Sequence, residues 1–246
     1  MKLLQLNIWN GRLYRKVLEL IEAEQPDILC LQEVFHGPTE TVMLEQQFNN
    51  RRTILAASGY EHGFFSPAAG VNFGGYTVDM GNLIVSKYPL LGQQTIFTAG
   101  EYAKQTNVTK NFPNVRNLQI CRVEISGKSL TVANHHGYWL TDPMGNEDTI
   151  RSFQVVAEAL KSVETPLVFA GDLNVIPEAP AMRVFDGFLE DLTATYNLET
   201  TLSELGKAFN VPCDHILVSP EIKVTDYRTS DMLVSDHKAV ILEFDI

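Results

Sequence analysis

Carboxylates border three apolar segments of the chain, at the points where each segment meets polar residues. Glu33 follows one such segment, Asp172 and Asn174 follow a second, and Asp236 and His237 precede a third. Ends of buried strands that open into loops are places where a rigid scaffold presents side chains to a ligand. Carboxylate and amide oxygens suit Mg²⁺ or Mn²⁺, and a carboxylate near a histidine suits proton transfer. Their shared placement at the ends of apolar strands is hard to obtain by accident and indicates a functional site.

Hydrophobic periodicity predicts the elements that position these residues in the first half of the chain. Leu4, Leu6 and Ile8 alternate with polar residues, as on one face of a strand, and a helical pattern follows that Asn10 could cap. The predicted strands cover 2–8, 27–32, 60–65 and 83–86, the helices cover 12–24 and 39–57, and a glycine-rich connection covers 69–75.

The second half has the same character. Ile150, Phe153 and Leu160 lie on one face of a predicted helix whose first turn carries acidic residues. The predicted elements are a hairpin of 117–125 and 129–135, this helix at 147–161, and strands at 166–170, 213–218, 222–228 and 238–244. Many strands with few helices predict an α/β fold, a four-layered α/β sandwich in which helices flank two packed, mainly antiparallel sheets. We expect residues 1–246 to form one catalytic domain.

Composition narrows the class of protein. Apolar residues make up 45% and charged residues 20% of the 246 residues, which is ordinary for a globular protein. No stretch approaches the roughly 20 apolar residues of a membrane span, and the apolar start is too short for a secretory segment. Three cysteines without a Cys-x-x-Cys pair predict reduced, buried thiols and a cytoplasmic protein, which we expect to be a monomer. The net charge of −11 gives no support to a broad nucleic-acid footprint.

Ordered motifs along nearly the whole chain resemble those of one large family. They are Leu6-Asn7-Ile8, Leu31-Gln32-Glu33, 81–89 (GNLIVSKYP), 132–136 (VANHH), 151–154 (RSFQ), 171–174 (GDLN), 214–219 (DHILVS) and Ser235-Asp236-His237. In this order they resemble the endonuclease/exonuclease/phosphatase superfamily, which has the deoxyribonuclease-I-like fold. The resemblance implies a divalent-metal-dependent hydrolase of phosphoester bonds, and it says little about the substrate.

The resemblance also implies a metal site. Glu33 would hold Mg²⁺ or Mn²⁺, with Asn7 and Asp236 as further ligands, directly or through water. A phosphodiester is anionic and repels nucleophiles, so its hydrolysis requires charge neutralisation, an activated water and stabilisation of the leaving oxygen.

Roles for the remaining residues follow from the same resemblance. Asp172 would orient and deprotonate the attacking water, and the amide of Asn174 would donate to a phosphate oxygen. His136 and His237 would contact the other phosphate oxygens, and Asp214 would accept a hydrogen bond from His237 and favour its protonated ring. Alternatively, Asp214 and His237 together act as the base, and the sequence does not decide between these assignments.

Several residues have competing interpretations. Alignment favours His136 over the neighbouring His135. Repair-type nucleases of the superfamily often have an acid two residues after the motif Asn, whereas this chain has Trp9, which weighs against repair of abasic sites. Trp9 would stack on a base or sugar of the substrate, or else line the cleft or core. The segment 99–116 mixes aromatic and basic residues and is either a substrate-facing loop or a solvated one; Arg116 is the cation expected to reach phosphate.

Several functional hypotheses follow. The first is a phosphodiesterase or nuclease, with nucleic acid among its candidate substrates. The second is a hydrolase of small or lipid-derived phosphates, either a phosphatase or a phospholipase, although no strong membrane-docking loop is evident. A non-catalytic binding module of the same fold would be expected to have lost catalytic residues, and the principal set is complete. Arg151 is expected to form structural ion pairs, and His36, His62 and His215 to be structural or peripheral.

Overall fold

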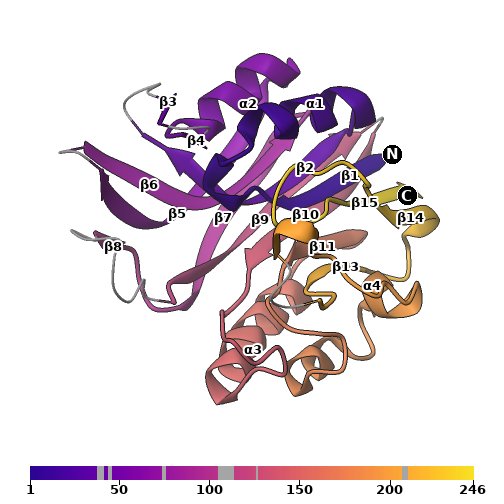
Figure 1. The fold of residues 1–246 in the computed structure, drawn as a ribbon. Helices are drawn as coiled ribbons and strands as arrows, with labels where there is room; N and C mark the ends of the chain where they lie inside the picture. The colour runs from indigo at the N-terminus through magenta and orange to yellow at the C-terminus, as the bar shows by residue number, and fades with distance from the viewer. Residues whose placement is uncertain (38–41, 44–45, 74–75, 105–113, 126, 207–209) are drawn as a thin grey trace.

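Two sheets packed face to face, with helices on their outer sides, form the protein (Figure 1). The computed structural model describes residues 1–37, 42–43, 46–73, 76–104, 114–125, 127–206 and 210–246. One sheet has seven strands in the order β14 (Lys223–Thr229), β15 (Val240–Asp245), β1 (Lys2–Asn7), β2 (Ile28–His36), β6 (Tyr76–Ser86), β5 (His62–Phe73) and β8 (Ala103–Lys104). The other has six strands in the order β12 (Glu190–Asp191), β13 (Asp214–Val218), β11 (Leu167–Asp172), β10 (Lys128–His136), β9 (Arg116–Ile125) and β7 (Leu90–Ala99).

Helices form the two outer layers. The seven-stranded sheet is covered by α1 (Tyr14–Glu24) and α2 (Asn50–Ser58), and the six-stranded sheet by α3 (Glu147–Lys161) and the 3-10 helix η2 (Pro180–Phe185). The shorter elements are η1 (Trp9–Gly11), β3 (Val42–Met43), β4 (Gln46–Gln47), α4 (Leu192–Thr195) and η3 (Glu204–Gly206). The described ladders are antiparallel except for β1 with β2, β5 with β8, and β10 with β11. The predicted four-layered, mainly antiparallel α/β sandwich is therefore confirmed. No helix among the described residues has the length and apolar character needed to cross a membrane.

Alternation along the strands decides which layer each side chain enters. Leu4 and Leu6 of β1 pack with Val17 of α1 in the outer core, while Leu3 packs with Val168 of β11 between the sheets. Burial of one leucine side chain stabilises the fold by about 1.5–3 kcal/mol. A slip of β1 by one residue would exchange its two faces, so this register is strongly favoured.

The layer between the sheets changes from apolar to polar toward the ends of β1 and β10. Gln5, Gln32 and Asn134 are fully buried there. Gln5 Nε2 donates to Gln32 Oε1 at 2.9 Å, and Gln32 Nε2 donates to Asn134 Oδ1 at 2.7 Å. Because buried amides are stable only when hydrogen bonded, these contacts fix the two sheets relative to each other. They separate the apolar core from the edge that carries the site.

Strand register aligns three ionisable residues across the six-stranded sheet. Asp172, at the end of β11, is paired with His136 of β10 on one side and with Asp214 of β13 on the other. Directly paired residues project from the same face of a sheet, about 5 Å apart. The three residues therefore form a row that faces the seven-stranded sheet, from which Asn7 reaches Asp172.

Two predictions for the helices of the first half were wrong in part. Asn10 does not cap α1: the helix begins at Tyr14 after an N-cap, Leu13, that makes no side-chain capping bond, and Asn10 has a φ of 54° and donates to Glu33 instead. The helix predicted over 39–57 begins only at Asn50. Part of its range forms β3 and β4, and 38–41 and 44–45 lie outside the described residues.

The glycine-rich segment 69–75 is mostly strand rather than a connection. β5 continues through Gly70 to Phe73 and pairs with β6, which begins at Tyr76. Farther along the same hairpin, Gly81 of β6 permits a close approach to β5, because a Cβ there would lie 2.0 Å from the Ser66 carbonyl oxygen. β7 was not predicted, since an edge strand with a mostly exposed centre lacks a buried alternating face.

Other predictions agree closely with the structure. The helix predicted at 147–161 spans Glu147–Lys161, and a capping box between Asn146 and Thr149 begins it. Arg151 forms ion pairs with Asp148 and Glu147 on the helix surface, as expected. All three cysteines are free and buried.

His215 of β13 holds the six-stranded sheet to the segment after β11. The fully buried ring contacts Asp191 Oδ2 through Nδ1 at 3.0 Å and the Val175 carbonyl oxygen through Nε2 at 2.8 Å. Both partners are acceptors, so both ring nitrogens donate and the ring carries a positive charge. Burial lowers the pKa of His215, but the charge of Asp191 and the two hydrogen bonds outweigh it and raise the pKa above 6.5.

We expect His215→Gln to lower the free energy of unfolding by about 3 kcal/mol at pH 6, because it removes one partner of a buried ion pair. A raised folded pKa contributes stability that is complete below the unfolded pKa of about 6.5 and is lost as the pH rises through the folded value. The difference between wild type and variant, measured by urea unfolding, should therefore shrink at alkaline pH. His62→Gln, at the start of β5, is the control, and an equal difference at pH 6 and pH 9 would contradict the assignment.

Candidate active site

Glu33 lies in a bulge of β2. The register between β2 and β6 shifts between Leu31 and Val34, and Glu33 has a φ of 56°, which is unusual for a residue with a side chain. Asn7 Nδ2 donates to one carboxylate oxygen at 3.2 Å, and Asn10 Nδ2 donates to the other at 2.8 Å. The bulge and these two amides together hold the carboxylate in one orientation.

Asp172 is the central carboxylate of the site and is only 1% exposed. Its Oδ2 accepts from Asn7 Nδ2 at 2.9 Å and lies 3.6 Å from His136 Nε2 and 3.7 Å from His237 Nε2. Its Oδ1 accepts from the backbone N–H of Asn174 at 3.1 Å. Asp172 therefore touches groups from both sheets and from the segment before β15.

Asp214 and His237 form a buried pair beside Asp172. His237 Nδ1 lies 2.8 Å from Asp214 Oδ2. The carboxylate also accepts from Thr201 Oγ1 at 2.7 Å and from Gln5 Nε2 at 2.8 Å. With Nδ1 directed at Asp214, Nε2 of His237 faces the cleft and Asp172.

The surroundings raise the pKa of Asp172 and of His237 and lower the pKa of His136. Burial raises the pKa of Asp172 to about 6, although the charge of His237 opposes the increase. Burial acts to lower the pKa of His237, but Asp214 and Asp172 together raise it well above 6.5, so this ring is protonated at neutral pH. Burial and the positive charge of Arg116 lower the pKa of His136 well below 6.5, so the contact between His136 and Asp172 is a polar contact with a neutral ring rather than an ion pair.

Arg116 and Asn174 meet at the carbonyl of Gly137. Arg116 Nε donates to the Gly137 carbonyl oxygen at 2.6 Å, and Asn174 Nδ2 donates to the same oxygen at 3.1 Å. Arg116 is only 7% exposed, and burial lowers the pKa of its guanidinium although Glu33 and Asp172 oppose this. It lines a small recess together with Glu33 and His136. This buried guanidinium therefore lies on the Glu33 side of Asp172.

The structure brings most of the predicted residues together. Asn7, Glu33, His136, Asp172, Asn174, Asp214 and His237 are joined by the contacts above, and Asp236 lies next to His237 and bonds to Ser235 Oγ through its Oδ1. His135 instead lies in the core against Phe153 and Phe169. The backbone N–H of Trp9 donates to Asn7 Oδ1, and its ring lies under the guanidinium of Arg12, with 4.5 Å between the guanidinium carbon and the ring centroid. Of the segment 99–116, residues 105–113 lie outside the described residues.

Sequence reasoning missed several supporting residues. Asn10, Gln5 and Thr201 each donate to a carboxylate of the site. Gln5 had a usable signal, because it shares a strand face with Asn7 and interrupts the apolar pattern of β1. Thr201 had none, because it lies in an irregular segment that only the folded chain brings against β13.

Glu33 and its surroundings fit a hard divalent cation. Burial raises the pKa of Glu33, and the negative charge of Asp236 raises it further, so a cation bound there would relieve both effects. The amides of Asn7 and Asn10 leave each carboxylate oxygen a lone pair for a cation. Carboxylate and amide oxygens are preferred by Mg²⁺ and Mn²⁺. A second group of buried donors, Asp172, Cys213 and His237, has ligand atoms within 4.8 Å of one another.

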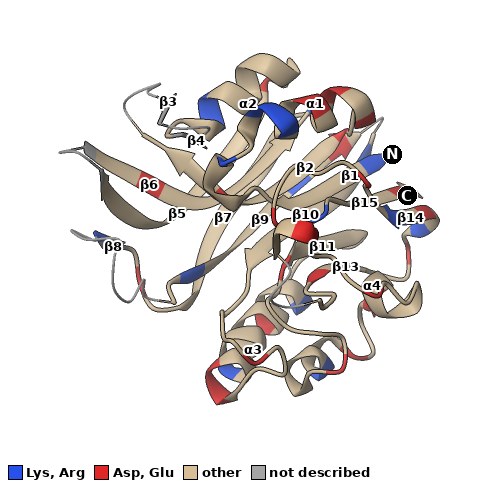
Figure 2. Cartoon of the chain, viewed as in Figure 1, with Lys and Arg blue, Asp and Glu red and all other residues tan. Residues whose placement is uncertain are grey.

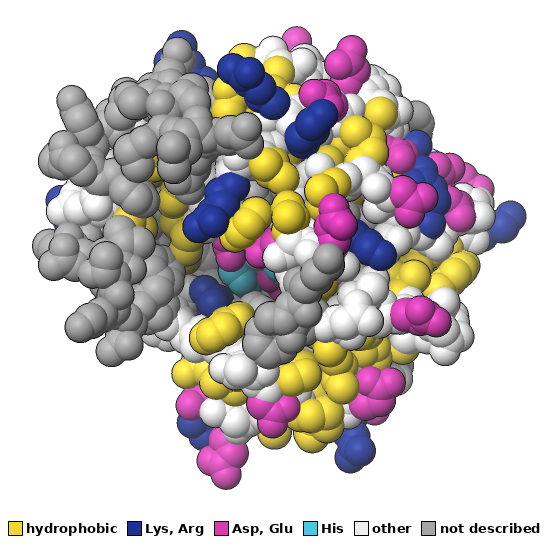
Figure 3. Space-filling model, in the orientation of Figure 1, with side chains coloured by type: hydrophobic (Ala, Val, Ile, Leu, Met, Phe, Trp, Pro, Cys, Tyr) yellow, Lys and Arg dark blue, Asp and Glu magenta, His cyan; other side chains and the backbone are white. Residues whose placement is uncertain are grey.

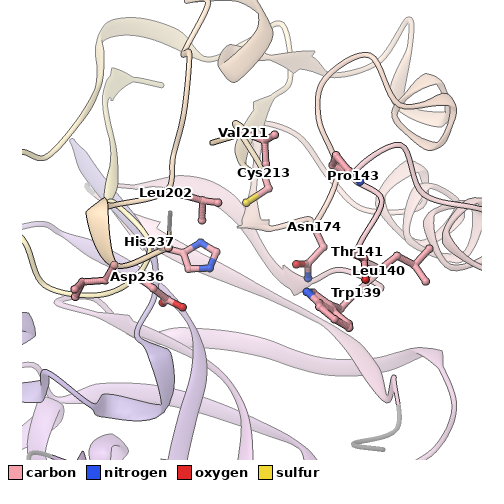
Figure 4. A pocket seen from close by; sticks show the side chains of 12 residues that line it. Trp139, Leu140, Thr141, Pro143, Asn174, Leu202, Val211, Cys213, Asp236 and His237 are labelled. Carbon is pink, nitrogen blue, oxygen red and sulfur yellow. The ribbon is translucent and has the colours of Figure 1, made fainter. Parts of the chain in front are cut away.

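A pocket of about 300 Å³ includes Asn174, Asp236 and His237 in its lining. Figure 4 shows Leu202 and His237 on one side of it and Trp139 and Thr141 on the other. On the molecular surface, acidic and histidine side chains lie at the bottom of a hollow bordered by apolar and basic side chains (Figure 3). Lys and Arg residues are spread over several elements and alternate with acidic ones (Figure 2).

The two sheets converge on buried carboxylates, amides and a charged Asp–His pair, which are groups that suit acid–base chemistry. The family model described as Endonuclease/Exonuclease/phosphatase family matches residues 4–237, and the chain belongs to this family, whose members are generally phosphoester hydrolases.

Solved structures share the fold. An endonuclease/exonuclease/phosphatase from Bacteroides vulgatus is 20% identical with a TM-score of 0.75, covering 100% of this chain and 98% of the other. The mannosyl-6-phosphatase Bt3783 of Bacteroides thetaiotaomicron is 18% identical with a TM-score of 0.70 and full coverage of both chains. D. rerio TDP2, complexed with a single-strand DNA product, is 16% identical with a TM-score of 0.71, covering 100% and 99%. A search of curated proteins found no match.

Proposed function

We propose that this chain is a divalent-metal-dependent phosphoester hydrolase of the phosphodiesterase type, in which Asp172 activates the attacking water. The observation that carries this proposal is the position of Asp172, which is buried between Asn7, His136 and His237. Burial raises its pKa to about 6, close to neutral pH, where a carboxylate is a more effective base than at its ordinary pKa. Asn174 N–H and Asn7 Nδ2 fix the two carboxylate oxygens so that a lone pair is directed at the cleft.

The protonation state of His237 supports Asp172 rather than the Asp214–His237 pair as the base. A ring that already carries both protons cannot accept another. Instead, His237 Nε2–H donates toward a non-bridging phosphate oxygen, and Asp214 stabilises the positive charge. His136, which is neutral, and the amide of Asn174 contact the remaining oxygens. Asp214 therefore acts on the substrate through His237.

Glu33, with Asn7 and Asp236 directly or through water, would hold Mg²⁺ or Mn²⁺. A bound cation of this kind supplies a Lewis acid that neutralises phosphate charge and stabilises the leaving oxygen. Arg116 adds a fixed positive charge on the same side of Asp172. Trp9 would line the substrate approach beside this site.

Two hydrolytic substrate classes are candidates. The first is a phosphodiester, with nucleic acid among the candidates, as in the DNA complex of TDP2. The second is a small phosphate ester, as the name of the mannosyl-6-phosphatase indicates for that protein. We propose a monomeric, cytoplasmic enzyme for either class.

Metal dependence and the role of Glu33 are tested in one experiment. The purified protein is assayed with Mg²⁺ or Mn²⁺, and with chelator, on a generic diester, nicked and abasic DNA, RNA, and inositol and sphingolipid phosphates. We expect turnover only with metal, and we expect Glu33→Gln to lower kcat about a hundredfold at low metal and less at saturating metal. Glu199→Gln, outside the site, is the matched control. Turnover that persists with chelator, or a Glu33→Gln variant with full activity at every metal concentration, would contradict the metal assignment.

A further inference from the structure

An exposed indole stands at the mouth of the pocket beside Asn174 and His237. Trp139 is 52% exposed and Leu205, which also lines the pocket, is 44% exposed, although most large apolar side chains in the described residues are buried. Leu202 and Val211 extend the apolar lining. Large apolar side chains gathered around a pocket, rather than scattered over the surface, indicate a binding surface.

The backbone of Trp139 is held in place. Its N–H donates to Asn114 Oδ1 at 3.0 Å, and its carbonyl oxygen accepts from Asn114 Nδ2 at 2.8 Å. Two residues earlier, the Gly137 N–H donates to the Asp172 carbonyl oxygen at 2.7 Å, so the segment that carries the indole is attached directly to the catalytic strand. A rigid aromatic side chain loses little entropy when a ligand binds.

The opposite wall is equally well fixed. Leu202 forms a β-bridge with His237, and the Ser203 N–H donates to the Asp236 carbonyl oxygen at 2.8 Å. Gly206 is pressed so closely against Asp236 that a Cβ would lie 2.6 Å from its carbonyl oxygen. The pocket therefore has a defined width between Leu202 and Trp139 (Figure 4).

Charge distinguishes this pocket from the Glu33 side of the site. Among its described lining residues the ionisable side chains are Cys213, Asp236 and His237, and none is Lys or Arg. Arg116 lines the recess on the other side, next to Glu33. Of these two described recesses, only the one beside Glu33 offers a guanidinium to a second phosphate, and the described lining of the pocket beside Trp139 consists mainly of apolar and uncharged polar side chains.

We propose that this pocket binds an uncharged, ring-bearing alcohol portion of the substrate and that Trp139 provides the stacking surface for the ring. The inference rests on the proposed function, because a phosphate held by Asn174 and His237 places its ester group at the pocket entrance. The volume of about 300 Å³ suits a single sugar or nucleoside rather than a long acyl chain. Both have an uncharged ring with a face that stacks on indole.

The test compares three alcohols, each supplied as a phosphate monoester and as a methyl diester: thymidine at its 5′ position, methyl glucoside at its 6 position, and 1-butanol. Hydrolysis is followed by phosphorus NMR. We expect Trp139→Ala to lower kcat/KM about tenfold for the ring-bearing esters, mainly through KM, and less than twofold for the butyl esters. The wild-type preference between thymidine and glucoside distinguishes a base from a sugar.

Two further variants serve as controls for the loss of an aromatic side chain. Trp139→Phe keeps an aromatic face and should retain most of the ring preference. Tyr196→Ala removes another exposed aromatic side chain, 45% exposed and outside this pocket, and should change nothing. An equal loss on all three alcohols in Trp139→Ala, or no loss at all, would overturn the proposal.

Fluorescence separates failure of this inference from failure of the proposed function. The chain has two tryptophans, so a change in wild-type emission that is absent in Trp139→Phe reports on Trp139. Thymidine 5′-phosphate or methyl glucoside 6-phosphate, added with chelator, should produce a saturable change in emission that butyl phosphate does not. If this change occurs but no ester is hydrolysed, the pocket stands and the hydrolase assignment fails. If hydrolysis depends on Glu33 but the emission is unchanged, the hydrolase assignment stands and the pocket proposal fails.

Discussion

Asp172→Asn is expected to lower kcat about a thousandfold while the protein remains folded. A positioned general base contributes about 10²–10⁴ in rate, and an amide cannot accept the proton of the attacking water. The substitution preserves the shape of a side chain that is only 1% exposed. It also removes a buried negative charge that lies near two others, since the charges of Asp214 and Glu33 both raise the pKa of Asp172.

Steady-state kinetics with saturating Mg²⁺, together with urea unfolding of the same samples, measure this effect. We expect KM to change little and the free energy of unfolding to stay within about 1 kcal/mol of wild type. Asp226→Asn on β14 is the matched control, because it makes the same change to a half-buried carboxylate that lies away from the site and pairs with Arg228. More than a tenth of the wild-type kcat in Asp172→Asn would rule out this carboxylate as the base.

Asp214→Asn should have the second largest effect on kcat and, unlike Asp172→Asn, should also lower the free energy of unfolding. Asp214 accepts from Gln5, Thr201 and His237, so the new amide nitrogen would face donors in every direction. Removing one partner of a buried ion pair costs about 3–5 kcal/mol. We therefore expect a clear loss of stability, in contrast to Asp172→Asn, and a fall in kcat of about a hundredfold.

The pH dependence should identify the cause of this loss. Asp214 raises the pKa of His237 well above 6.5, so the wild-type ring stays protonated at neutral pH. Without that charge the pKa falls toward its ordinary value, and the protonated form is lost at lower pH. The rate of Asp214→Asn should therefore fall as the pH rises through neutrality, where wild type is still fully active. NMR titration of the His237 ring checks the shift directly, and an unchanged His237 pKa would show that Asp214 acts only on stability.

Much of the fold was predictable because strand and helix periodicity is local. The alternation in β1 and the one-sided apolar face of α3 were read correctly, and Glu147–Lys161 had the expected boundaries. Predictions failed where packing overrode local preference. Within the range predicted to be helical before Asn50, Val42–Met43 and Gln46–Gln47 form short strands, and the residues near Gly70 became part of a long hairpin because β5 pairs with β6 as far as Phe73.

The sequence by itself determined which chemical groups are present and which stand at strand ends. Glu33, Asp172 and His237 were recognisable because a charged residue beside an apolar strand is informative wherever it occurs. Only the tertiary structure decided which of them meet. Asn7 donates to Asp172 across 165 residues of chain, and this contact depends on two sheets packing with one particular register.

Features that depend on contacts between distant segments could not be predicted from the sequence. The direction of Glu33 depends on a bulge relative to β6, and the charge of His237 depends on its burial against Asp214. The pocket has one wall at Trp139 and the other near Leu202, segments that no local pattern links. Residue type and periodicity are properties of short stretches, whereas proximity, burial and the pKa values that follow from them arise only when distant stretches pack together.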